Sequence, residues 1–469
     1  MSKAYRSASV SPPIARTVHA AASVAISADP ASKTRQNHAE KAIHTENPGA
    51  DRPLLVREWS SITLPPMRLR FGAFLAPHHP VGEHPMLLYR RDLDFVEQLD
   101  RLGFDEFWCG EHHSSGWETI ASPEMFLAAA GQRTARINLG TGVVSLPYHH
   151  PFNVAQRIAQ LDHMTGGRAM FGSGPGALPS DARVHGIDPR LLRPRQDEAL
   201  GVIIRLLAGE PRFSYECEWF ELHDAALQIL PLQEQVPMAV ASMFSPSGMQ
   251  LAGKYGIGVL SIGSNSLEGL RALPTQWSFA EDAAAQHGRT VDRANWRVLL
   301  SWHLAESRDQ AVAEAAHGLH EWHNEYNVRV LGRPDAFPVE DPFELIEQVS
   351  GRGAAGAGVA IVGTPGDAVE AIRTLYDTVG GFGVVLGFAH DWANHEATKR
   401  SWELFARYVI PEVNGFTRGL RESAEYLAAN KGDLIAGASA AVLDQIMANP
   451  KAAEALDITI RQMAQPDGE

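Results

Sequence analysis

Residues 104–151 read FDEFWCGEHHSSGWETIASPEMFLAAAGQRTARINLGTGVVSLPYHHP, and this stretch decides the fold. It holds two apolar runs that each end in paired histidines, His112 and His113 in the first and His149 and His150 in the second. Parallel strands are buried along their length and carry chemistry at their C-terminal ends, where they meet solvent and ligand. The stretch therefore predicts two parallel strands with functional tips and favours a small-molecule enzyme.

A strand-then-helix alternation continues on both sides of this stretch. The apolar runs expected to be strands are residues 68–76, 104–113, 137–146, 168–176, 236–243, 256–263, 296–305 and 382–388. Helical patterns separate them, which is typical of parallel strands joined by crossover helices. We therefore expect residues 67–415 to form an α/β fold, a (β/α)8 TIM barrel with insertions, since such a barrel takes about 250 residues. An open doubly wound sheet is the alternative, but it normally has fewer strands and an early phosphate-binding glycine turn.

The two ends of the chain differ from this central part. Residues 1–66 are rich in Ala, Ser and Pro and hold few aromatic residues before Trp59. Such a segment buries too little apolar surface to offset the entropy of ordering it, so we expect a disordered extension. Met67 directly precedes the first strand-like run and is a candidate true start. Residues 416–469 are predicted to form a helical, amphipathic tail.

Composition narrows the class of protein. The net charge is -14 at pH 7, with 55 acidic against 41 basic residues, which argues against a nucleic-acid partner. The two cysteines, Cys109 and Cys217, leave little scope for a disulfide framework and fit a reducing cytoplasm. No uncharged apolar run approaches the roughly 20 residues that span a bilayer. The sequence therefore predicts a cytoplasmic protein with no membrane or nucleic-acid partner.

The histidine pairs have three interpretations. Adjacent residues on an extended segment point to opposite sides, so one of His112 and His113 is expected to face the barrel mouth as a general acid or base. The pair is equally compatible with histidines that are only hydrogen-bonded at a strand end. A zinc site that also uses His149 and His150 is disfavoured, because consecutive histidines splay apart and no H-x-H or H-E-x-x-H spacing is present. We therefore expect no metal.

Glycines gather where the barrel mouth would be, at Gly140, Gly142, Gly172, Gly174 and Gly176. Glycine within a strand usually marks a bulge or the close approach of another group to the backbone. A flat ring system lying against the strands needs such clearance. Tight turns at the strand ends are the alternative explanation.

A candidate anion site follows the fifth strand. Ser245, Ser247 and Gly248 lie at the start of a predicted helix. Hydroxyl groups and free backbone N–H groups at a helix N-terminus bind anions, and the helix dipole strengthens the site. Simple helix capping by Ser245 is the alternative. Arg193 and Arg195 are each able to bind a phosphate with two N–H groups, or are ordinary solvated charges.

Several of these segments together resemble the bacterial luciferase-like, flavin-dependent monooxygenase superfamily. The matching segments are FGAFLAP, WCGEHH, SPEMFLAAAGQRT, LGTGVVSLPYHHPFNVAQRIAQLDHMTGGRAMFGSGPGALPSD and SPSGMQLAGKYG. Members of this superfamily are (β/α)8 barrels that bind reduced flavin and form a C4a-hydroperoxide with dioxygen. The resemblance implies an enzyme that inserts one oxygen atom from O2 into a small apolar substrate, such as the epoxidation of a limonene-type terpene. NAD(P)H would be the ultimate reductant.

The resemblance also assigns roles to residues near the flavin ring. His112 matches the catalytic histidine thought to transfer a proton near the flavin. Gly142 and Val143 match the position of a non-proline cis peptide beneath the isoalloxazine. Gly174 stands where luciferase has a reactive cysteine, so the resemblance does not extend to light emission.

The same resemblance assigns the phosphate contacts and the partners. Ser245, Ser247 and Gly248 match the flavin phosphate cradle, and Arg193 is a second contact. FMN is favoured over FAD, the reductant acts directly or through a separate flavin reductase, and a homodimer is expected. The alternatives are an F420-dependent hydride-transfer enzyme on the same barrel and a non-catalytic flavin-binding barrel.

Overall fold

The computed structural model describes residues 68–463 except 77, 334–335 and 352–358, so the predicted extension 1–66 lies outside the described residues. The described residues belong to two compact units, one up to Thr417 and one from Arg418 onward. The first unit holds a parallel barrel. Its strands are β1 (Arg70–Leu75), β2 (Glu106–Cys109), β3 (Asn138–Thr141), β5 (Ala169–Gly174), β8 (Met238–Ser242), β9 (Gly258–Ser261), β10 (Trp296–Leu304) and β12 (Val384–Ala389).

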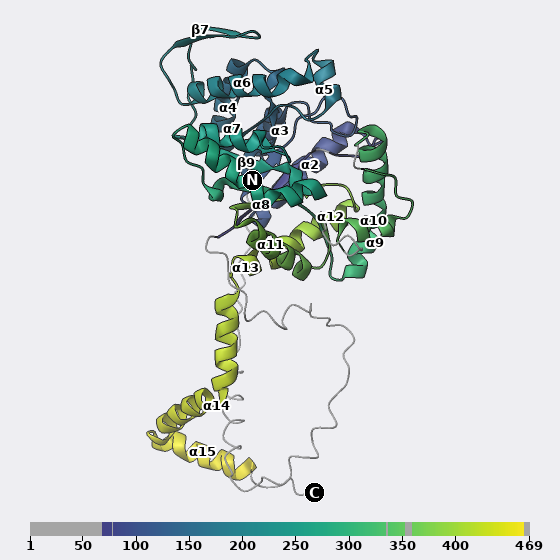
Figure 1. Ribbon diagram of the computed structural model, residues 1–469. Coiled ribbons are helices and arrows are strands. Elements are labelled where there is room, and N and C mark those ends of the chain that lie inside the picture. The colour runs from purple at the N-terminus through teal and green to yellow at the C-terminus, as the bar shows by residue number, and fades with distance from the viewer. Residues whose placement is uncertain (1–67, 77, 334–335, 352–358, 464–469) are drawn as a thin grey trace, which may run out of the picture. The chain divides into compact units, whose positions relative to one another are not determined.

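The barrel closes because β12 pairs in parallel with both β1 and β10. Between them the order runs β1-β2-β3-β5-β8-β9-β10, with every pairing parallel. The eight barrel strands are the eight predicted from the sequence, and the (β/α)8 fold class is confirmed. The helices around the strands (Figure 1) are α2 (Pro85–Leu102), α3 (Pro123–Gly131), α4 (Pro151–Thr165), α6 (Leu192–Leu207), α7 (Ser247–Tyr255), α8 (Leu267–Gln286), α9 (Arg308–Glu321), α11 (Pro365–Val379) and α12 (His395–Leu404).

The insertions are short and were not predicted in detail. The chain between α6 and β8 forms the antiparallel hairpin β6 (Phe213–Glu216) and β7 (Glu221–Ala225). Strand β11 (Ala360–Gly363) pairs with the C-terminal part of β10, and β4 (Val144–Ser145) pairs with β5. The remaining elements are α5 (Pro179–Val184), α10 (Pro342–Val349), the π-helical segment η5 (Trp322–Val330), the π-helical η6 (Phe405–Val409), α13 (Ile410–Val413) and the short 3-10 turns η1 (Leu146–Tyr148), η2 (Pro189–Leu191), η3 (Ile262–Asn265) and η4 (Arg293–Asn295).

Local sequence signals set the helix boundaries. Helix α4 begins with Pro151 at its first position and ends at Gly166, whose φ of 67° is the left-handed conformation that glycine adopts without strain. Helix α11 begins with a capping box, in which Thr364 and Asp367 bond each other's backbone N–H groups. These boundaries fix where each strand ends and therefore where the polar tips lie.

The second unit consists of α14 (Arg418–Met447) and α15 (Pro450–Met463), which pack against each other. Its described side chains include exposed apolar residues, among them Leu420, Leu427, Leu434 and Val442. Among residues 68–463, leaving the three gaps aside, no helix is long and apolar enough to cross a membrane.

Candidate active site

A cavity opens at the C-terminal ends of the barrel strands. Phe74 from β1, Phe388 from β12 and Met243, just after β8, contribute to its apolar wall. His112 and the Gly142–Val143 peptide line the same cavity. The two sequence motifs predicted to meet at the barrel mouth therefore do so.

His112 is held between two carboxylates. Its Nδ1 lies 3.1 Å from Oδ2 of Asp181, and its Nε2 lies 3.4 Å from Oε1 of Glu118. Burial opposes the charged imidazole, but the charge of Glu118 and the hydrogen bond to Asp181 outweigh it and raise the pKa of His112. The charged form of His112 is therefore favoured relative to that of a free histidine. Nδ1 makes the tighter contact, so Nε2 is the nitrogen left for a reacting partner.

Glu118 links three side chains of the cavity wall. Its Oε1 lies 2.8 Å from Nε2 of His78, and the Tyr326 hydroxyl also bonds this carboxylate. Burial works against its charge, yet His112 and His78 hold the pKa of Glu118 at about 2. Burial lowers the pKa of His78 itself, which favours the neutral form of this ring. Sequence reasoning did not single out His78, Tyr326 or Asp181, and Glu118 appeared only within the GEHHSSGWE motif.

The other three histidines of the two pairs contact other groups. Oε1 of Glu111 lies 2.9 Å from Nε2 of both His113 and His149, and its Oε2 accepts the Ser145 backbone N–H at 3.0 Å. Although burial works against the charge of Glu111, these partners hold its pKa at about 2. His150 packs edge-on against Phe220. Adjacent histidines thus point apart, and within the described part of the chain no group of three or more His, Cys, Asp or Glu is placed to hold a metal.

The peptide bond between Gly142 and Val143 is cis, at the position that the resemblance indicated. A Cβ on Gly142 would lie 2.9 Å from Cβ of Trp108 and 3.0 Å from Cε2 of Phe74. A Cβ on Gly174 would lie 2.5 Å from Cγ2 of Val143, so Gly174 makes room for the Val143 side chain. The Cβ position of Gly142 thus faces Trp108 and Phe74, and these two side chains leave no room for a larger residue there.

The other glycines of the cluster make room for different neighbouring groups of the protein. A Cβ at Gly140 would collide with the buried ring of Trp108, and a Cβ at Gly172 would collide with the Thr141 carbonyl oxygen. Gly176 has a φ of 89° and lies against the Tyr148 hydroxyl. The close neighbours of these glycines, like those of Gly142 and Gly174, are protein atoms, so the expectation that the cluster gives clearance to a flat ligand stays a prediction.

The predicted anion site is assembled at the start of α7. Nε of Arg193 donates to Oγ of Ser247 at 3.2 Å, and the hydroxyls of Ser245 and Ser247 are 3.0 Å apart. Pro246 occupies the N-cap position and no side chain caps the helix, so capping by Ser245 does not explain these serines. A Cβ on Gly248 would collide with the Ala241 carbonyl, so glycine lets α7 pack directly on β8.

The remaining candidates divide between wall, core and surface. Arg195 lies over the Trp219 ring, 5.2 Å from its centroid, and does not belong to the hydroxyl cluster. Phe74 and Met243 line the cavity, whereas Trp108 and Leu146 are core residues. Phe244 is 60% exposed.

A cavity at the C-terminal ends of the strands of a parallel barrel, lined by a histidine that is paired with two carboxylates, lies where TIM-barrel enzymes have their active sites. Residues 69–381 match the family described as luciferase-like monooxygenase. The chain belongs to this family, as its sequence predicted, and is a monooxygenase of the luciferase-like class.

Two relatives are similar over most of their length. The chain is 48% identical over 364 residues to 4-hydroxyprotoasukamycin monooxygenase of Streptomyces nodosus subsp. asukaensis, covering 77% of this chain and 96% of the relative. It is also 48% identical over 350 residues to limonene 1,2-monooxygenase of Rhodococcus erythropolis, covering 74% and 87%. Among solved structures, the oxygenating constituent of 3,6-diketocamphane monooxygenase from Pseudomonas putida, in complex with FMN, superposes with a TM-score of 0.61 at 26% identity, covering 74% and 99%.

Proposed function

We propose that this protein uses reduced flavin and O2 to add one oxygen atom to a small, largely apolar substrate of the terpene type, such as an alkene that becomes an epoxide. One observation carries the proposal: His112 and the Gly142–Val143 peptide line one cavity at the C-terminal ends of the barrel strands, and the Arg193–Ser247 pair lies at the start of the helix that follows β8. Two relatives at 48% identity are monooxygenases, and one of them acts on limonene.

The residues present fit a flavin mononucleotide. Ser245, Ser247 and Arg193 would hold its phosphate, because they offer hydroxyl and guanidinium donors beside the N-terminus of α7. The Gly142–Val143 peptide would lie against the ring, since it lines the cavity. The bound flavin would supply the activation of dioxygen, and NAD(P)H would supply the electrons directly or through a flavin reductase.

His112 then supplies the proton. Asp181 holds the ring through Nδ1, and the raised pKa of His112 favours the form that carries a proton on Nε2 as well. A proton held at Nε2 is available to an oxygen that leaves during the transfer. Phe74, Phe388 and Met243 exclude water from the same space, which suppresses wasteful side reactions of the activated oxygen.

The test is NADH-driven oxygen uptake with a flavin reductase, FMN or FAD, and limonene, with products identified by mass spectrometry. We expect an epoxide in proportion to the oxygen consumed, and we expect H112Q to slow its formation at least about 100-fold, the usual contribution of a general acid. F420 binding with hydride transfer and no oxygen uptake would contradict the proposal. Unchanged epoxide formation by H112Q would remove His112 from the mechanism.

A further inference from the structure

Arg333 lines the cavity from an element that the phosphate cradle does not use. It follows the π-helical segment η5, and it faces the same cavity as His112 and Val143. Its backbone N–H bonds the Asn327 carbonyl at 3.0 Å, and Asn327 is buried. The position of Arg333 at the cavity wall is therefore set by the fold of this segment.

Among the residues that the structure describes, the guanidinium of Arg333 has no partner. Nothing in the described residues forms a hydrogen bond or an ion pair with it, although it carries five N–H donors and its residue is partly buried. The nearby carboxylate of Glu118 is already engaged by His78, Tyr326 and His112. Leaving a partly desolvated charge without a partner costs free energy, so a hydrogen-bond acceptor that enters the cavity should bind to this arginine.

The wall around Arg333 is otherwise mostly apolar. Leu331, Phe388 and Trp322 line the same cavity. Nε1 of Trp322, a second N–H donor, likewise has no hydrogen-bond partner within the described part of the chain. The flavin phosphate does not account for Arg333, because the cradle at the start of α7 has its own arginine, Arg193.

We propose that Arg333 determines substrate specificity by binding an oxygen acceptor, such as a carbonyl, on an otherwise apolar carbon skeleton. A guanidinium has donors only, so a pure hydrocarbon leaves it unpaired while a carbonyl oxygen satisfies it. A site built to hydrogen-bond one substrate group discriminates strongly against an analogue that lacks it. The inference rests on the proposed monooxygenase function and narrows its substrate class from hydrocarbons to oxygenated terpenoids.

Limonene and carvone test this inference, because carvone has the same carbon skeleton with one added carbonyl. Binding of each is measured by calorimetry on the protein loaded with oxidised FMN, in wild type, R333M, R333K and R195M. We expect wild type to bind carvone at least about tenfold more tightly than limonene. R333M should bring carvone down to the affinity of limonene and leave limonene and FMN binding within about twofold, while R333K keeps part of the preference.

The control R195M removes a like charge that lies over Trp219 outside the cavity, and it should bind both compounds as wild type does. Equal affinities of wild type for the two compounds, or an equal loss of both in R333M, would overturn the inference. A loss of FMN binding in R333M would overturn it as well, by assigning Arg333 to the cofactor. If wild type bound no flavin at all, the proposed function would fail instead, and carvone binding to the flavin-free protein would then decide the role of Arg333.

Discussion

At the scale of single residues, the site depends on how His112 is held. Asp181 reaches it from α5, 69 residues further along the chain, and accepts from Nδ1. The same carboxylate accepts the His113 backbone N–H at 3.2 Å and the Ser114 hydroxyl. Asp181 therefore orients the imidazole and also stabilises its charged form.

Replacing Asp181 by Asn should shift the pH profile of turnover. Loss of the negative charge lowers the pKa of His112, so the proton that it donates is lost at a lower pH. We expect the alkaline limb of kcat to move down by about one pH unit, a usual effect of one neighbouring charge. Ser180→Ala, which removes a neighbouring hydroxyl that bonds Ser114, is the control. An unshifted alkaline limb in D181N would show that His112 does not set it.

Replacing Arg193 by Met should weaken flavin binding about tenfold or more, since charge-assisted hydrogen bonds to phosphate are the strong ones. The matched control is R195M, because Arg195 lies on the same helix but contacts Trp219. Fluorescence titration with FMN measures both dissociation constants, and thermal unfolding checks that each variant folds. Equal losses in the two variants would contradict a specific cradle at Ser247.

The sequence was sufficient for His112, the Gly142–Val143 peptide and the assembly of Arg193 with Ser245 and Ser247. The resemblance to the luciferase-like family carried these assignments, including that of Arg193 and Ser247, which are 54 residues apart. Asp181 stands in a matched segment and Glu118 shortly after another, but no role was assigned to either, and Arg333 lies outside every matched segment. Carboxylates and arginines of this kind are common on protein surfaces, and only the folded barrel distinguishes them.

At the scale of elements, regular strands were predictable and irregular insertions were not. The eight barrel strands are mostly buried and lie in apolar runs of the sequence, which a pattern search detects. Most residues of the β6–β7 hairpin are half-buried or exposed, and β11 pairs with the C-terminal part of β10. Such short segments gain their structure from the neighbours they pair with rather than from their own pattern.

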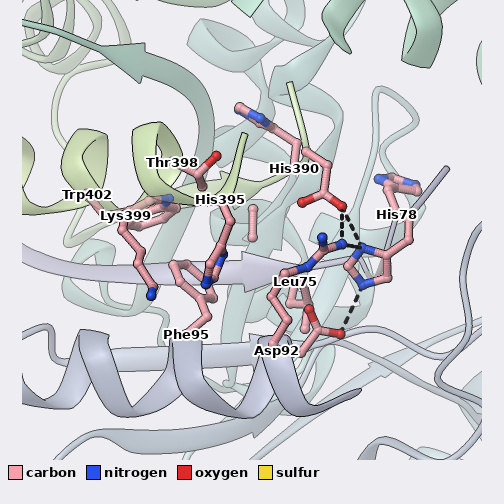
Figure 2. A pocket seen from close by; sticks show the side chains of 13 residues that line it. Leu75, His78, Asp92, Phe95, His390, His395, Thr398, Lys399 and Trp402 are labelled. Carbon is pink, nitrogen blue, oxygen red and sulfur yellow. Dashed lines mark hydrogen bonds and ion pairs between the residues drawn. The ribbon is translucent and has the colours of Figure 1, made fainter. Parts of the chain in front are cut away.

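A buried ion cluster lies where β12 closes the barrel against β1. Nδ1 of His79 lies 2.7 Å from Oδ2 of Asp391, and its Nε2 lies 3.0 Å from Oδ2 of Asp92 on α2. Arg91 donates to the same Asp391 oxygen at 2.6 Å. Figure 2 shows these ion pairs around Asp92 at one end of a small pocket, with the His78 ring turned away from them. The cluster joins α2 to the closing strand.

This cluster should make the stability of the barrel depend on pH. Burial opposes its charge, but the hydrogen bonds to Asp391 and Asp92 raise the pKa of His79 to about 9, against 6.5 for a free histidine. The stabilisation is complete below pH 6.5 and is lost as the pH rises towards 9, because the unfolded chain releases its proton first. The total is up to about 3 kcal/mol. Urea unfolding at pH 6, 7.5 and 9 measures it, and H79Q should flatten the decline. Parallel pH profiles for both proteins would contradict this role of His79.

At the scale of the whole molecule, the catalytic features belong to one of the two units. The family match ends at residue 381, and the relative from Streptomyces is covered over 96% of its length by only 77% of this chain. The unit of α14 and α15 contributes no residue to the cavity or to the cradle. The domain division predicted from the sequence, with a barrel up to residue 415 and a helical tail after it, remains a prediction that truncation tests directly.

A chain ending at Thr417 should unfold with the same free energy as the barrel of the full chain and should keep its oxygen uptake with FMN. A chain ending at Val413 should not, although it is only four residues shorter. Asn414 donates to the Leu69 carbonyl and accepts the Leu69 backbone N–H, both at 2.9 Å, and Phe416 lies 4.2 Å from the Arg68 guanidinium. These contacts tie the end of the unit to the start of β1, so the shorter chain should lose about 1–3 kcal/mol, the cost of leaving two backbone groups unpaired.

Guanidinium unfolding compares the free energy of unfolding of the two truncated chains. A large loss of stability in the chain that ends at Thr417 would show that α14 and α15 stabilise the barrel. Equal stability of the two truncated chains would show that the hydrogen bonds between Asn414 and Leu69 do not stabilise it.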